Sequence, residues 1–110
     1  MIFLGKYEEF APGMGFPSLK DFVCSDSYEG KEDVVEYLKM GDIHLISPSL
    51  VVDEITGKRT DWTSVHMNDG QYSWSSRFLY HVEKYNIRLQ PEVEEDILRK
   101  YRTMKKTSKG

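Results

Sequence analysis

The segment between residues 43 and 67 is rich in strand-forming residues, and patterns typical of helices stand on both sides of it. Within it, β-branched and aromatic residues concentrate at 43–46, 50–52 and 62–67. A Gly-containing turn at 56–59 separates the last two of these runs. Asn68-Asp69-Gly70 ends the region with a strong turn signal. The sequence therefore predicts a sheet in the middle of the chain, to which residues 2–4 can add a short edge strand.

Three segments have the periodicity of amphipathic helices. Their apolar faces are Val34, Val35 and Leu38 within 31–40; Phe78, Leu79, Val82 and Tyr85 within 75–85; and Val93, Ile97, Leu98 and Tyr101 after Pro91. Ser75 or Ser76 can cap the second helix and Asn86 can end it, while Pro91 suits the first turn of the third. The order of elements predicts an α+β fold, with a small antiparallel sheet of about three to four strands and three main helices packed on it.

Charge is distributed unevenly along the 110 residues. Residues 99–110 contain six Lys or Arg and no acid, whereas residues 1–98 contain nine basic and eighteen acidic residues. We expect a single α+β domain over 1–98, followed by a basic C-terminal helix end and flexible tail over 99–110. The acidic body makes nucleic-acid binding an unfavoured reading and suits a basic protein partner instead.

The residues that could carry chemistry are scattered. His44, His66 and His81 lack the spacing of a metal motif, and no Gly-x-Ser-x-Gly element is present. Asp53 and Glu54 are adjacent, so on a strand they point to opposite faces. A hydrolase would need His44 or His66 beside an acid in a cleft. We therefore expect no enzymatic activity, no metal and no cofactor.

The sequence also bears on location. No stretch approaches the roughly 20 apolar residues of a membrane span, so we expect no membrane association. Cys24 is the only cysteine and cannot form an internal disulfide, which favours a reducing compartment. We expect a cytoplasmic protein.

Aromatic and acidic residues gather around the turn between the predicted sheet and the second helix. They are Asp61, Trp62, Asp69, Tyr72 and Trp74. One interpretation is a core corner where the helix docks on the sheet. The other is an aromatic binding hot spot rimmed by acids. The sequence leaves both interpretations open.

The chain resembles a group of small, mostly uncharacterised bacterial proteins of similar length. The resemblance spans roughly residues 28–96 and rests on an Asp-Gly-x-Tyr-x-Trp element at 69–74. The flanking segments that also fit are Ser47-Pro48, Val52-Asp53, Thr56-Gly57-Lys58, Leu79-Tyr80, residues 82–86 and Leu89-Gln90-Pro91-Glu92. The Leu-Pro that usually precedes the last helix reads Leu89-Gln90-Pro91 here, which shifts the expected helix start by one residue.

Some members of this group are encoded beside polymorphic or contact-dependent toxins. The resemblance therefore implies an immunity protein that binds and neutralises a cognate toxin domain, and the acidic body suits a basic toxin domain as that partner. The expected partner-binding residues are Asp53, Glu54, Asp61, Trp62, Asp69, Tyr72 and Trp74, with the acids steering association and the aromatic rings supplying contact area. The alternative is a small-molecule or peptide-binding regulatory domain that uses the same aromatic corner as a pocket.

Overall fold

Four strands and four helical segments make up the fold in a computed structural model, which describes residues 1–108 and the side chains of residues 1–106. In chain order they are β1 (Ile2–Phe3), the 3₁₀ helix η1 (Leu19–Phe22), α1 (Lys31–Lys39), β2 (Asp42–Val52), β3 (Arg59–Asn68), β4 (Tyr72–Ser75), α2 (Ser76–Tyr85) and α3 (Pro91–Ser108). The strands form one sheet in the order β1-β4-β3-β2.

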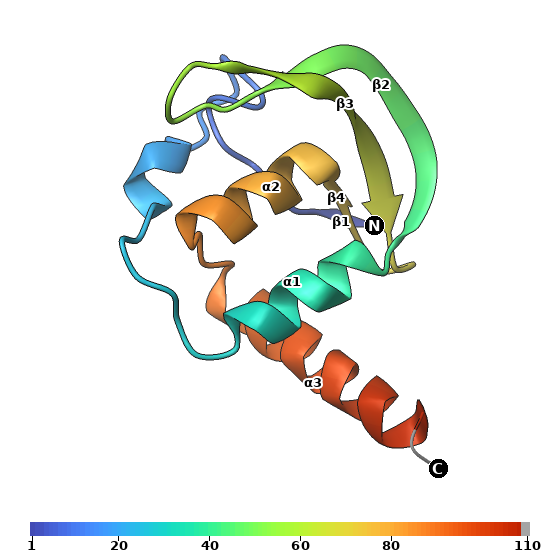
Figure 1. The fold of residues 1–110 in the computed structure, drawn as a ribbon. Coiled ribbons are helices and arrows are strands. Elements are labelled where there is room, and N and C mark those ends of the chain that lie inside the picture. The colour runs from blue at the N-terminus through green and yellow to red at the C-terminus, as the bar shows by residue number, and fades with distance from the viewer. Residues whose placement is uncertain (109–110) are drawn as a thin grey trace.

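The α+β class is confirmed, with one difference in the sheet. Strand β3 pairs antiparallel with both β2 and β4, but β1 runs parallel to β4, so the sheet is mixed and not wholly antiparallel as predicted. Helix α2 packs on β3 and β4, and α1 packs on both α2 and α3. Figure 1 shows the long β2–β3 hairpin arching over α2, with α2 lying between that hairpin and α1.

Strand β4 is an element that the sequence analysis did not predict. Tyr72–Ser75 pairs with the end of β3, where Met67 lies opposite Trp74. The Ser75 hydroxyl accepts the amide of Phe78 at 3.0 Å, so Ser75 both ends β4 and caps α2, as one of the two predicted caps. The strand therefore leads directly into the helix, without a loop between them.

The two runs predicted at 43–46 and 50–52 belong to one strand, β2. Its pairing with β3 shifts register at three places, one of them between Ile46 and Leu50. Pro48 lies within that shift, and proline is tolerated on an edge strand because it has no amide to donate to a ladder. Such irregularities bend a strand, in keeping with the curved hairpin of Figure 1.

The C-terminal segment is more regular than predicted. Helix α3 begins at Pro91, as expected, and continues to Ser108, so most of the predicted basic helix end and tail is helical. Residues 109–110 of that predicted tail lie outside the described residues. Among the described residues, no helix is both long enough and apolar enough to cross a bilayer.

The core is centred on Trp74, which is fully buried. Its indole N–H donates to the carbonyl of Leu38 at 3.1 Å and so ties β4 to α1. A Cβ added at Gly41 would lie 2.5 Å from Cζ2 of Trp74, closer than packed atoms can approach. Gly41 is therefore needed because the indole fills the space in which any other side chain would begin.

We predict that Gly41→Ala lowers the free energy of unfolding by about 1–3 kcal/mol, because the added methyl group overpacks the core. Urea denaturation measures the change. In a Trp74→Phe background the smaller ring vacates that space, so the same substitution should be less damaging there. Equal effects of Gly41→Ala in both backgrounds would contradict this explanation.

Candidate partner-binding surface

The structure places Asp69, Tyr72 and Trp74 in a core corner, the first of the two interpretations that the sequence left open. Trp74 and Tyr72 are buried, and the Tyr72 hydroxyl donates to Asp96 at 2.8 Å. One oxygen of Asp69 accepts the amides of Gln71 and Tyr72, and the other accepts the Tyr37 hydroxyl at 2.5 Å. In this arrangement the three side chains hold the end of the sheet against α1 and α3 and present little surface to a partner.

The electrostatics of Asp69 follow from these contacts. Burial by itself would raise the pKa of this carboxyl group. The hydrogen bonds from Tyr37, Tyr72 and Gln71, together with the ammonium of Lys100, outweigh burial and hold the pKa below its usual range. Asp69 is therefore an ionised structural group at neutral pH.

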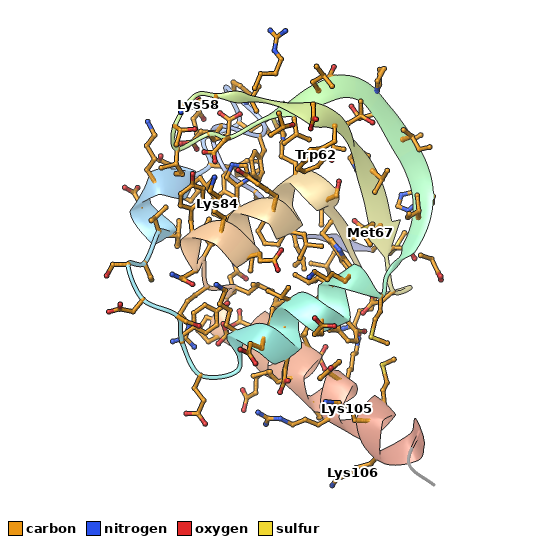
Figure 2. All side chains as sticks on the ribbon, in the orientation of Figure 1. Lys58, Trp62, Met67, Lys84, Lys105 and Lys106 are labelled. Atoms are coloured by element: carbon orange, nitrogen blue, oxygen red, sulfur yellow. The ribbon has the colours of Figure 1, made fainter. Side chains whose placement is uncertain are left out.

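Asp53 is likewise a buried structural group. One of its oxygens accepts the amides of Ile55 and Thr56, at 2.9 and 3.0 Å. The other accepts the hydroxyls of Tyr80 and Tyr85, at 2.7 and 2.5 Å, and lies 3.4 Å from the ammonium of Lys84. These contacts fasten the turn of the β2–β3 hairpin to α2, and Figure 2 shows Lys84 on α2 below the turn that carries Lys58.

Burial opposes ionisation of Asp53, but the two tyrosine hydroxyls and the two turn amides reverse that effect and lower its pKa well below the usual range. His81 packs beside this group and is fully buried. Its Nε2 accepts the amide of Glu54 at 3.0 Å, so the proton lies on Nδ1, which donates to the carbonyl of Arg77 at 2.7 Å. Burial lowers the pKa of His81 and keeps this ring neutral.

Three of the expected binding residues retain accessible surface. Asp61 is exposed, and Glu54 and Trp62 are half-buried. The Trp62 ring packs edge-on against Tyr80, with 5.7 Å between ring centroids, and it lies between β3 and α2 in Figure 2. The hairpin therefore brings Glu54, Asp61 and Trp62 to one end of the molecule, apart from the buried corner around Trp74.

The most exposed apolar surface lies on β2. The exposed fractions of Ile43, Leu45, Ile46 and Leu50 are 60%, 58%, 67% and 43%. Strand β2 is the last in the sheet, and in the described part of the chain no strand pairs with its outer edge. Leu45 and Ile46 pair with the adjacent His66 and Val65, so the four residues line both faces of this edge strand. Exposed apolar residues along an unpaired sheet edge are typical of a protein-binding surface. We call these four residues the β2 row.

The sequence analysis counted the residues of the β2 row as strand formers and did not identify them as a surface. A signal was available, because residues 43–52 contain no charged side chain in a chain that is 30% charged. They also lack the regular alternation of apolar and polar residues that marks a half-buried strand. A long uncharged strand is usually a central one, and only its position at the end of the sheet exposes it.

The histidines on this hairpin are near one another, as the sequence allowed. The rings of His44 and His66 are 6.4 Å apart between centroids, and Nδ1 of His44 lies 2.9 Å from the side-chain amide of Asn68. Within residues 1–108, no group of three His, Cys, Asp or Glu side chains is arranged to hold a metal ion.

Comparisons with known proteins identify no relative: no family model, no curated protein and no solved structure matches this chain. The surface that bears on function is therefore the β2 row, on a body with an excess of acidic residues.

We predict that Asp53→Asn lowers the free energy of unfolding at pH 7 by about 3 kcal/mol, because the buried donors lose their charged acceptor. The folded-state pKa of Asp53 is depressed, so its contribution is present above the unfolded pKa, near 4, and is lost as the pH falls below it. The difference between wild type and variant should therefore shrink in acid, as measured by urea denaturation across pH.

The exposed Asp61 on the same hairpin provides the control. Asp61→Asn should change stability by less than about 0.5 kcal/mol at any of these pH values. Both variants should still lose stability below about pH 6.5, because the folded state keeps His81 neutral while the unfolded state protonates it. A difference between wild type and Asp53→Asn that stays constant from pH 7 to pH 3 would contradict the assignment.

Proposed function

We propose that the protein is a non-catalytic binding protein of the bacterial cytoplasm, an immunity protein that binds and neutralises a cognate toxin domain. The observation that carries the proposal is the β2 row, four large apolar side chains held in solvent on an unpaired sheet edge. The β2 row does not stabilise the isolated protein, because apolar area exposed to water is unfavourable. Burial by a partner removes that area from water.

The charge around the row supports a basic partner. Asp42 begins β2 and Asp61 lies on the adjacent strand, and both are exposed. These acids belong to a body that carries eighteen acidic and nine basic residues over positions 1–98. An uncharged apolar centre on a body with an excess of acids suits a basic protein, because the net negative charge accelerates encounter and the apolar centre supplies the buried contact.

The irregular edge of β2 favours docking through side chains over a continuous added strand. Pro48 has no amide to donate, and the register of the hairpin shifts between Ile46 and Leu50. A partner strand could pair with only a short part of this edge. The same feature limits pairing of the edge with a second copy of the chain.

The location in the cytoplasm is supported by Cys24, which is exposed and unpaired. An exposed free thiol is stable in a reducing compartment and is prone to oxidation outside it. An inhibitor located in the cytoplasm can bind a toxin that acts inside the cell.

We predict that the protein forms a 1:1 complex with the toxin domain encoded by its neighbouring gene and abolishes the activity of that domain. Ile46→Asp should weaken the complex by about thirtyfold or more, because it places a charge in the apolar centre of the interface. Calorimetry measures the affinity, and growth of cells that express the toxin measures protection.

Met14→Asp is the matched control, since Met14 is a similarly exposed apolar residue in a loop far along the chain from β2. It should leave affinity and protection unchanged, and neither variant should alter thermal stability, because both side chains are already in solvent. The proposal fails if the neighbouring product is not toxic and forms no complex. Equal effects of the two variants would show that the β2 row is not the interface.

A further inference from the structure

A pocket of about 430 Å³ lies at the N-terminal side of the molecule, away from the β2 row. Its walls come from segments distant in sequence: residues 2–7, Phe16 and Pro17, Phe22 of η1, Phe78 of α2, residues 88–90, and Pro91 and Val93 of α3. This volume falls within the range of small-molecule sites, at its lower end. The pocket belongs to none of the contacts that support the proposed function.

The lining of the pocket is mainly apolar. Phe78 is almost fully buried at its base, and Leu4, Leu89 and Val93 are also buried side chains. Gly5 lets the N-terminal segment approach closely, since a Cβ there would lie 3.3 Å from the Phe78 ring and its φ is +95°. These contacts hold the wall formed by residues 2–7 against α2, so the pocket is built from packed elements.

Tyr7 supplies a polar group without a partner in the fold. The side chain is 8% exposed and is held between the rings of Phe22, Phe10 and Phe78, at centroid distances of 5.5 to 6.0 Å. Its hydroxyl makes no hydrogen bond within the described residues. Every fully buried side-chain nitrogen or oxygen among them does have a partner, so this hydroxyl must reach accessible space, and the pocket is the space that Tyr7 lines.

The state of this hydroxyl is fixed by its surroundings. Burial raises the pKa of Tyr7 to about 12, so at neutral pH the group keeps its proton. It is therefore available as a hydrogen-bond donor to an acceptor in the pocket.

Two cationic residues line the pocket, and they differ in what they already contact. The guanidinium of Arg88 pairs with Glu94 at 2.5 Å and lies over the Tyr28 ring, so its charge is compensated. Lys6 is exposed and makes no ion pair or hydrogen bond within the described residues. The pocket thus combines an apolar interior with one uncompensated cation and one free donor.

We propose that this pocket binds a small carboxylic acid with an apolar body, whose carboxylate pairs with Lys6 and accepts the Tyr7 hydroxyl. The apolar body would occupy the space between Phe78 and Leu89. A neutral apolar ligand would leave the donor and the cation unused, and a cationic ligand would be repelled by Lys6. This site is independent of the β2 row, so it stands or fails separately from the toxin-binding proposal.

Decanoate is the probe, titrated into the full-length protein and followed by two-dimensional NMR of the backbone amides. We expect saturable shifts concentrated in residues 2–7, 16–22 and 88–93. Decan-1-ol, a neutral molecule of the same chain length, should bind about tenfold more weakly, since it lacks the charge that pairs with Lys6. Shifts located elsewhere, or equal binding of the two probes, would overturn the proposal.

Lys6→Met should weaken decanoate binding about tenfold and leave decan-1-ol binding unchanged. Lys58→Met is its matched control, because Lys58 is an exposed lysine on the hairpin turn that does not line the pocket, and it should alter neither affinity. If the Lys6→Met and Lys58→Met variants bind decanoate equally well, the carboxylate of decanoate does not pair with Lys6.

Tyr7→Phe separates a binding role from a structural one. Because the hydroxyl has no partner in the fold, its removal should leave the thermal midpoint unchanged while weakening decanoate binding about tenfold. Tyr101→Phe, at a buried tyrosine outside this pocket, should change neither the midpoint nor the affinity. A Tyr7→Phe variant that is destabilised but binds decanoate normally would show that the hydroxyl serves the fold and not a ligand.

Discussion

The buried carboxylate of Asp53 is the interaction on which the shape of this protein depends. Five donors surround it, two from backbone amides of the hairpin turn and three from side chains of α2. A buried charge is unfavourable unless its partners are in place, so the turn has one well-defined position on the helix. With both ends of the hairpin fixed, by this turn and by the pairing of β3 with β4, the strand between them must curve over α2.

That curvature explains why β2 carries an exposed apolar row. Helix α2 covers the inner side of the hairpin, α1 packs on the far side of α2, and α3 packs on α1, so neither α1 nor α3 covers β2. The four residues of the β2 row therefore remain outside the core, although large apolar side chains are usually buried. The apolar surface is a consequence of how the helices are stacked.

The features that could be predicted from the sequence are those set by neighbouring residues. Ser75 as a cap, Asn86 in the left-handed conformation at the end of α2, and Pro91 at the start of α3 all follow from local backbone chemistry. Strand β4 was missed because four residues are too few to show the periodicity of a strand. These residues form a strand because they pair with β3. The structural role of Asp53 was missed because it depends on residues distant in the sequence, and the exposure of the β2 row was missed because it depends on the position of β2 at the end of the sheet. The tyrosines that bury Asp53 lie 27 and 32 residues further along the chain.

The pairing of β1 with β4 has a consequence for how the chain folds. Ile2 lies opposite Tyr72, and the two are 70 positions apart. Closing so long a loop is entropically unfavourable until other contacts have shortened it. During synthesis, β1 therefore leaves the ribosome well before its partner β4, and the pocket that residues 2–7 help to form is among the last features of the molecule to be completed.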